Sequence, residues 1–319
     1  QKNYKYFRKG FSKNRQSTNR FIPKLIIHFV LTMNSKYILL LTYNREKKTS
    51  EVLNNLKRTA NIDKYELVVI RQEGNEKVKD LIDSIEWIKV HHIPTQKRES
   101  IKQSINYNIH LGLQYCFETL FAKHVVILED DIVIGFDFLL FCENIIEKYY
   151  FNNKFRAING FSAEKFDNTE IANYARFRYG VGWGWCLTDR VWKKLQSIWS
   201  GKENAHFDAL IEPFMKVGFV IMPKCSRILN IGWGNDNSHS PQMEDDEIYV
   251  KLKNSWVGSN PIPTIEYIEQ TNIKYTWRND CLPYFDNSIF NKISNLIYFY
   301  FQSVLIYLKY YISCLKKNV

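Results

Sequence analysis

The run Val125-Val126-Ile127-Leu128-Glu129-Asp130-Asp131 decides the fold, because four apolar residues stop abruptly on three acids. Three of the four apolar residues are β-branched, which is typical of a strand that is buried on both faces. Three carboxylates at the tip of such a strand repel one another and lose hydration unless a cation lies beside them. In open α/β sheets, ligands bind at the carboxyl ends of the strands. We therefore predict a divalent metal carrying a phosphorylated ligand at this tip; the alternative is an acidic surface turn after an ordinary core strand.

Strands and helices alternate on both sides of this run. The apolar patterns predict strands at 37–42, 66–70, 87–92 and 155–159, and helices at 49–56, 78–85, 101–120 and 136–149. Further on they predict helices at 189–199, capped by Asp189, and 207–217, disturbed at Pro213, followed by a strand at 219–222. This alternation is typical of an α/β fold with a doubly wound, mainly parallel sheet flanked by helices.

The charge is concentrated at the two ends of the chain. The net charge is +11, yet residues 1–32 carry eight Lys and Arg without an acid, and residues 287–319 carry four without an acid. The part between them therefore has a net charge of about −1, which argues against a nucleic-acid-binding core. Basic ends on a neutral body suggest contact with an anionic membrane surface.

The six cysteines are scattered and contain no C-x-x-C pair. Cys116 and Cys142 lie in apolar, helix-like patterns, so we expect reduced core thiols rather than a disulfide framework or a zinc site. Together with the basic ends, this predicts a cytoplasmic protein peripheral to a membrane.

The chain is expected to have three parts. Residues 1–34 form a basic arm, for which disorder and a mis-extended reading frame before Met33 are alternatives, and residues 35–285 form the main domain. Residues 286–319 form an apolar and basic amphipathic helix. Its tyrosines and polar interruptions favour an in-plane membrane helix; a transmembrane helix and a helix packed on the domain are the alternatives.

Several motifs occur together in one order. The acidic run is followed by Asp137 between Phe136 and Phe138, and it is preceded by Tyr43-Asn44-Arg45 after the first strand. Downstream come three further motifs: Gly182-Trp183-Gly184-Trp185, Phe207-Asp208 and Asn230-Ile231-Gly232-Trp233-Gly234 leading to Ser238-His239. From about residue 37 to 240 this arrangement resembles the N-acetylglucosaminyltransferase I family and its bacterial relatives, which are glycosyltransferases of the GT-A fold. That resemblance implies a Rossmann-like, mixed but mainly parallel sheet.

The resemblance implies a nucleotide-sugar donor, UDP-linked in the family, held through Mn²⁺ or Mg²⁺. Hard oxygen ligands suit both ions, which neutralise the charge that develops on a diphosphate leaving group. By resemblance Asp131 is the direct metal ligand, while Glu129 and Asp130 position the nucleotide ribose and the water shell of the metal. Support of the site from a distance is the alternative for the latter two.

Other donor contacts follow from the same resemblance. Arg45 lies where the family has an arginine near the nucleotide, and Glu73 replaces an aspartate that contacts uracil; both are surface charges in the alternative interpretation. Asn108 aligns with a family histidine, with His110 two residues on.

Asp208 is the candidate general base. An inverting transfer needs a carboxylate that removes the proton of the acceptor hydroxyl, and Phe207-Asp208 matches the family's pairing of an aromatic residue of the sugar pocket with that acid. The alternative for Asp208 is an acid that merely favours the helix N-terminus, with Glu212 as the reserve base.

Trp183 and Trp185 offer flat faces for sugar rings, although tryptophans are also common in protein cores. The loop 232–239 is rich in small and polar residues, as expected of a lid over a diphosphate. Within it, Ser238 is a candidate phosphate contact and His239 a candidate metal ligand.

The sequence thus predicts an inverting, metal-dependent glycosyltransferase that moves a GlcNAc-like sugar to a glycan or lipid-linked acceptor. A retaining enzyme of the same fold and a catalytically silent module that binds glycans or membranes are the alternatives.

Overall fold

The computed structural model describes residues 35–162, 167–178, 182–199, 207–232, 253–262 and 266–270. Within these ranges, the side chains of Lys102, residues 207–210 and Glu212 are left undescribed. The expected basic arm and the expected C-terminal helix lie outside the described residues. Among the helices inside them, none is both long enough and apolar enough to cross a bilayer.

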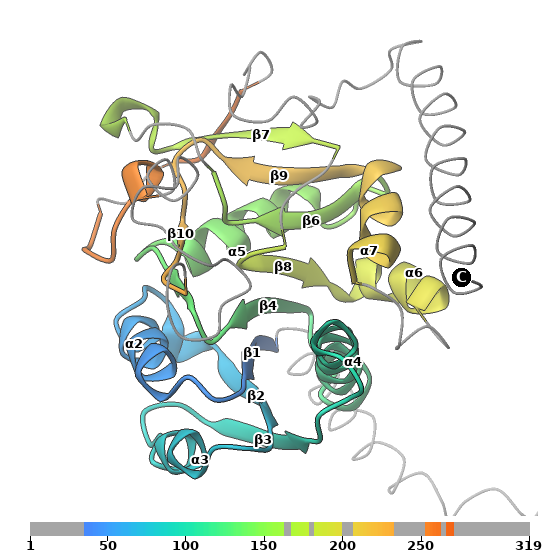
Figure 1. Ribbon diagram of the computed structural model, residues 1–319. Coiled ribbons are helices and arrows are strands. Elements are labelled where there is room, and N and C mark those ends of the chain that lie inside the picture. The colour runs from blue at the N-terminus through green and yellow to red at the C-terminus, as the bar shows by residue number, and fades with distance from the viewer. Residues whose placement is uncertain are drawn as a thin grey trace, which may run out of the picture.

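A nine-stranded mixed sheet runs through the described part, in the order β11-β7-β9-β6-β8-β4-β1-β2-β3 (Figure 1). Its strands are β1 (Lys36–Thr42), β2 (Glu66–Gln72), β3 (Val90–Thr95), β4 (His124–Glu129), β6 (Phe155–Asn159), β7 (Asn173–Phe177), β8 (Trp185–Thr188), β9 (Phe219–Pro223) and β11 (Ile268–Glu269). β8 is antiparallel to β4 and β6, and β7 is antiparallel to β9, whereas the other pairs are parallel. A mainly parallel, mixed sheet was expected and is confirmed.

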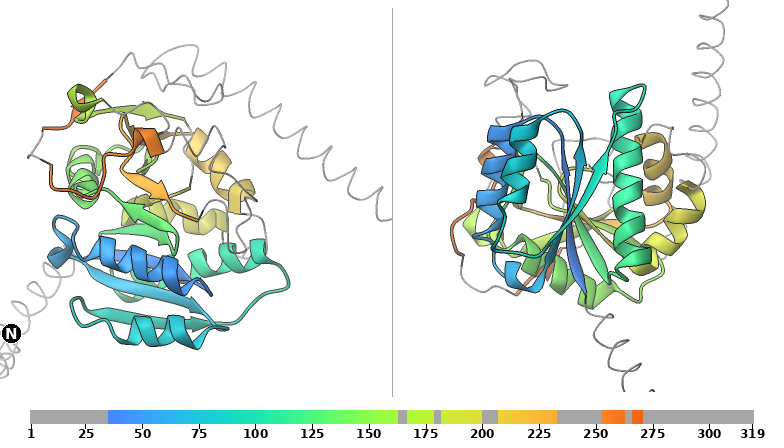
Figure 2. Two further views of the ribbon diagram at one scale, coloured as in Figure 1. Left: turned by 60° about the vertical axis from the view of Figure 1, so that its left-hand side comes forward. Right: turned by 90° about the horizontal axis from the view of Figure 1, so that it is seen from below.

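Helices cover both faces of this sheet. They are α2 (Glu46–Leu56), α3 (Glu76–Asp83), α4 (Ile101–Gln114), α5 (Phe138–Tyr149), α6 (Asp189–Trp199) and α7 (Phe207–Lys216), with short turns η1 (Ile62–Lys64), η2 (Tyr115–Thr119) and η3 (Asn168–Glu170). Viewed from below, α2 and α3 lie on one face, and α4, α6 and α7 lie on the other (Figure 2). Because both faces are covered, Val125, Val126, Ile127 and Leu128 of β4 are all buried, as their unbroken apolar run predicted.

A second, two-stranded sheet pairs β5 (Ile132–Ile134) with β10 (Ile228–Asn230). β5 follows the acidic tip of β4 directly, and its antiparallel register pairs Ile132 with Asn230. This pairing brings the chain after β10 back to the acidic tip.

Several details differ from the sequence-based prediction by more than a shift of two or three residues at a helix end. The third strand begins at Val90 rather than Trp87. Trp87 and Ile88 are apolar because they pack against the core in the segment before the strand, not because they belong to the strand. The helix predicted over 101–120 is α-helical only to Gln114 and continues as a π-helical turn to Thr119. Thr188, not Asp189, caps α6: its Oγ1 accepts a hydrogen bond from the backbone N–H of Val191 at 3.4 Å, whereas Asp189 accepts one from the Tyr150 hydroxyl.

The four cysteines in the described part, Cys116, Cys142, Cys186 and Cys225, are buried free thiols. Burial raises the pKa of the Cys116 thiol well above its usual value. The expectation of core thiols is confirmed for these four, and Cys281 and Cys314 lie outside the described residues.

Candidate active site

The strand order reverses direction beside β1, and the charged residues gather there. β1 pairs in parallel with β2 on one side and with β4 on the other. The chain leaves β1 into α2, which leads to β2, whereas the strand on the other side comes later in the sequence. Such a switch point leaves a crevice at the carboxyl ends of the strands, where ligands bind in open α/β sheets. Leu41 is level with Glu129, so the residues that follow the two strands meet at this edge.

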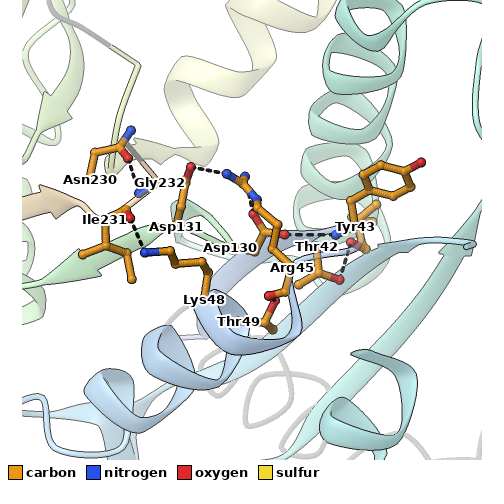
Figure 3. A network of polar contacts seen from close by, with 11 residues as sticks. Thr42, Tyr43, Arg45, Lys48, Thr49, Asp130, Asp131, Asn230, Ile231 and Gly232 are labelled. Atoms are coloured by element: carbon orange, nitrogen blue, oxygen red, sulfur yellow. Dashed lines mark hydrogen bonds and ion pairs between the residues drawn. The ribbon is translucent and has the colours of Figure 1, made fainter. Parts of the chain in front are cut away.

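Arg45 joins the two aspartates at the tip of β4 (Figure 3). Its NH2 group lies 2.5 Å from Oδ1 of Asp130, and its NH1 group lies 2.7 Å from Oδ2 of Asp131. The backbone N–H of Tyr43 donates to the other Asp130 oxygen at 3.2 Å. Because Arg45 stands at the N-terminus of α2, the helix start fixes its position relative to the acids.

The segment after β10 closes the site from the other side (Figure 3). The backbone N–H of Ile231 donates to the Asp131 carbonyl at 2.8 Å, and the backbone N–H of Gly232 donates to Oδ1 of Asn230 at 2.8 Å. Lys48 of α2 donates from Nζ to the Ile231 carbonyl at 2.5 Å. A Cβ atom on Gly232 would lie 2.0 Å from Oδ2 of Asp131, so the close approach of backbone to carboxylate requires glycine here.

The acidic tip carries more negative charge than Arg45 neutralises. Burial, together with the charges of Asp131 and Asp130, raises the pKa of Glu129 to about 8. Burial likewise raises the pKa of Asp130 to about 6, although Arg45 opposes this shift. Among the described residues, Arg45 is the cation that pairs with these carboxylates. The net charge of the site is therefore negative, which favours the binding of a further cation.

One oxygen of Asp131 has no hydrogen-bond partner within the described part of the chain. Oδ2 accepts from Arg45, but Oδ1 is buried and unbonded. A buried, unbonded carboxylate oxygen is costly unless a ligand satisfies it. An oxygen donor with excess negative charge around it suits Mn²⁺ or Mg²⁺, so the residues present fit the metal that the sequence predicts. Among the described residues, no group of three or more His, Cys, Asp or Glu side chains is placed to ligate a metal.

Comparison with known proteins places the chain in a family. The model of the GNT-I family matches residues 4–279, which is most of the chain. The chain belongs to the GNT-I family. Members of this family are glycosyltransferases, the class that the acidic tip and its accompanying motifs predicted. No curated protein is significantly similar to the chain in sequence.

Solved structures of other proteins also align with it, at low similarity. A structure of S. aureus TarS 1–349 in complex with UDP-GlcNAc aligns with 11% identity and a TM-score of 0.45, covering 68% of this chain and 64% of that one. The mannosyltransferase PcManGT from Pyrobaculum calidifontis, in complex with GDP-Man and Mn²⁺, aligns with 12% identity and a TM-score of 0.39, covering 66% and 67%. A second structure of TarS 1–349 aligns over 59% of its length, so the chain matches only about three fifths of these TarS structures.

Two predicted donor contacts, Glu73 and Asn108, lie away from the network around Arg45. Glu73 follows β2 at the same edge of the sheet, with an exposed side chain and a backbone N–H that donates to Thr95 at 2.8 Å. Asn108 is buried on α4, and its Oδ1 has no hydrogen-bond partner among the described residues. His110 instead packs against the rings of Trp192 and Trp199 on α6. Of the two α4 candidates, Asn108 is thus the one with an unused polar atom.

The two tryptophans differ in exposure. Trp185 is only 4% exposed and sits in β8, paired with Ile127 of β4. Trp183 is partly exposed and meets the ring of Phe161 edge-on, with ring centres 5.5 Å apart. Trp183 therefore exposes more of its ring than Trp185 does.

The predicted base, Asp208, lies on helix α7. α7 begins at Phe207, so Asp208 stands in its first turn, and the helix packs against α4, α6, β6 and β9. The side chains of Phe207, Asp208 and Glu212 lie outside the described part of the structure. Ser238 and His239 also lie outside it. α7 continues through Pro213 to Lys216.

Lys48 was missed by the sequence analysis. Its position three residues after Arg45 on α2 is the signal that could have found it, since residues three apart share a helix face. What the sequence could not reveal is its partner, the Ile231 carbonyl, which lies 183 residues further along the chain.

Proposed function

We propose that this chain is an inverting, metal-dependent glycosyltransferase that moves a sugar, GlcNAc-like, from a nucleotide-sugar donor to a glycan or lipid-linked acceptor. Membership of the GNT-I family supports the reaction class. The observation that carries the metal dependence is the buried, unbonded Oδ1 of Asp131, at a strand tip with more negative charge than Arg45 neutralises.

The acidic tip would hold the leaving group. Asp131 would ligate Mn²⁺ or Mg²⁺, which when bound neutralises charge developing on the diphosphate. Glu129 and Asp130 would position the ribose and the metal's water shell. Arg45 keeps both aspartates in place before the donor arrives, and Lys48 holds the segment that ends in Gly232 against them. Such pre-positioning lowers the cost of organising the site around the donor.

The remaining roles complete the donor site. Glu73, Asn108, Trp183, Trp185, Phe207 and Ser238 are proposed donor contacts, and His239 is proposed as a second metal ligand. Asp208 would remove the proton of the acceptor hydroxyl with its carboxylate as the hydroxyl oxygen attacks the anomeric carbon.

The proposed setting is a membrane surface in the cytoplasm. It rests on the basic residues of 1–32 and 287–319, which carry no acid. Each such cation near an anionic bilayer adds about 1 kcal/mol of attraction.

A thermal-shift panel of nucleotide sugars, with and without Mn²⁺, tests the function. A metal-dependent rise in the melting temperature with one UDP-sugar is expected, because a ligand that binds only the folded state stabilises it. Absence of any shift across the panel, together with absence of donor hydrolysis, would favour a catalytically silent module. Release of product with the donor's own anomeric configuration would favour a retaining enzyme.

A further inference from the structure

The two most exposed large apolar side chains of the described residues lie at the edge of the sheet formed by the amino ends of the parallel strands. The active site lies at the other edge, where these strands end. Phe121 is 63% exposed and precedes β4, and Phe151 is 78% exposed and precedes β6. Both stand at the amino ends of their strands, whereas Asp130 and Asp131 follow the carboxyl end of β4. Exposed aromatic rings that are gathered at one edge mark an interaction surface.

Cations lie over the rings of Tyr150 and Phe151 at this edge. The guanidinium of Arg190 lies 5.5 Å from the centre of the Tyr150 ring and 5.4 Å from that of Phe151. Nζ of Lys123, two residues after Phe121, lies 5.4 Å from the Tyr150 ring centre. We call Phe121, Lys123, Phe151, Lys154, Arg190 and Lys194 the basic aromatic edge.

The cations of this edge crowd one another. Burial lowers the pKa of Lys194, and the positive charges of Arg156, Arg190 and Lys154 lower it further. The carboxylates of Asp189 and Glu118 lie beside them and keep their charge, since they accept hydrogen bonds from the neutral Tyr150 hydroxyl, Trp192 ring nitrogen and Gln196 amide. The four cations of the edge outnumber these two carboxylates. The edge thus presents positive charge around protruding rings, the pattern of surfaces that enter the headgroup region of anionic membranes.

The basic N-terminal residues join the fold at this edge. Ser35 precedes β1 and donates from its hydroxyl to the Phe121 carbonyl at 3.0 Å, while the backbone N–H of Lys123 donates to the Ser35 carbonyl at 2.9 Å. The segment 1–32, with its eight cations, therefore precedes in the chain a residue that is hydrogen-bonded to the basic aromatic edge.

Charge also argues against the chain covering this edge with its own ends. Residues 1–32 and 287–319 are both free of acids, so neither offers a complementary charge to Lys123, Arg190 and Lys194. A second copy of the same edge would bring like charges together, which is costly. An anionic surface is the complement that the edge requires.

We propose that the basic aromatic edge docks the folded domain on an anionic lipid surface, with Phe121 and Phe151 inserted among the headgroups. The lysines and Arg190 contact the lipid phosphates. In this orientation the active site points away from the bilayer, separated from it by the length of β1, about 20 Å. An acceptor anchored in the same bilayer must then span that distance to reach Asp131.

Co-sedimentation of the full chain with vesicles tests this proposal. The vesicles contain phosphatidylcholine with phosphatidylglycerol, and vesicles of phosphatidylcholine alone serve for comparison. We expect binding only to the anionic vesicles. The double variant Arg190→Gln/Lys194→Gln should bind about 25-fold more weakly, since each cation contributes about fivefold. Phe151→Ser should weaken binding about tenfold, because it removes an apolar side chain that inserts into the bilayer. The Phe151 side chain is exposed, so its replacement leaves the core of the fold intact.

The matched control is Lys77→Gln/Lys97→Gln, which removes two exposed cations beside the carboxyl ends of β2 and β3. It should bind vesicles as the wild type does. Equal binding by the control and by both edge variants would overturn the proposal and assign membrane contact to the basic ends alone. If a single-stranded oligonucleotide displaces the wild-type protein from the vesicles, the proposal is also overturned, in favour of a nucleic-acid partner. Vesicle binding requires no nucleotide-sugar donor. A negative result in the nucleotide-sugar panel would therefore contradict the proposed enzymatic function and leave the proposed membrane-binding surface unaffected.

Discussion

Gly232 lies so close to Asp131 that a Cβ atom at position 232 would meet Oδ2 of the aspartate at 2.0 Å. The contact joins the segment after β10 to the tip of β4, and Lys48 holds that segment through the Ile231 carbonyl. The position of the proposed metal ligand thus depends on backbone that lies a hundred residues away in the sequence.

Gly232→Ala should displace the Asp131 carboxylate and weaken Mn²⁺-dependent donor binding by about 100-fold, because shifts of about 1 Å at a site cost that much. Isothermal titration with UDP-sugar and Mn²⁺ measures it. Gly218→Ala is the matched control, since its Cβ would meet the Lys154 carbonyl at 2.1 Å far from the site. It should lower the melting temperature and leave donor affinity intact. Equal donor affinity in both variants would contradict the role of Gly232.

Arg45→Gln should lower the melting temperature of the metal-free protein, because it leaves Asp130 and Asp131 without their cation. The loss of a partner from such a partly buried cluster is expected to cost about 3 kcal/mol. Mn²⁺ alone should then stabilise the variant more than it stabilises the wild type, since the metal replaces the missing charge. Thermal shifts with Mn²⁺ and without donor measure both effects. An identical Mn²⁺ response in the two proteins would argue against a metal at this tip.

Asp208→Asn should reduce turnover by about 100- to 10,000-fold while leaving the affinity for the donor unchanged, because removal of a general base slows proton transfer without removing a donor contact. Glu212→Gln is the comparison, since Glu212 lies on the same helix, α7. Turnover and donor affinity are measured separately. If Glu212→Gln loses turnover and Asp208→Asn retains it, the base is Glu212.

Arg227 and Asp137 form a buried ion pair, with Nε of the arginine 3.0 Å from Oδ2 of the aspartate. Arg227 immediately precedes β10, and the Tyr267 hydroxyl donates to the same oxygen at 2.8 Å. Arg227→Met should lower the free energy of unfolding by about 3 kcal/mol, because it leaves Asp137 buried without its cation. Urea denaturation measures this loss. The double variant Arg227→Met/Asp137→Asn should recover much of it; a double variant no more stable than the single one would refute the pairing.

His124 should make the stability depend on pH. Burial lowers its pKa to about 3 from an ordinary value of about 6.5, and it is only 2% exposed. Between these pH values the unfolded chain binds a proton at His124 that the folded chain does not. The contribution of His124 to stability is therefore fully present above about pH 6.5 and is lost as the pH falls toward 3. From pH 7 to pH 5 we expect a loss of about 2 kcal/mol from this residue. His124→Gln should lose correspondingly less over that range in urea denaturation, and parallel slopes in the two proteins would disprove the assignment.

The long apolar patterns of the sequence were sufficient for the central part of the fold. β1, β2 and β4 and the helices between them were predicted because each is buried through its own residues, so local pattern and tertiary environment agree. The short strands β5, β7, β8, β10 and β11 were not predicted. They have two to five residues each and exist because a neighbouring strand supplies hydrogen-bond partners, which no local pattern records.

For the site, the sequence by itself determined which chemical groups stand at the tip of the central strand: Glu129, Asp130 and Asp131, with Arg45 after the first strand. It did so because an acidic end to a buried apolar run demands a cation. Only the tertiary structure decided how these groups are shared: Arg45 takes one oxygen from each aspartate and leaves Oδ1 of Asp131 unbonded. It also decided that Lys48 and Gly232 belong to the site, because contacts between residues far apart in the chain depend on strand order and register rather than on spacing in the sequence.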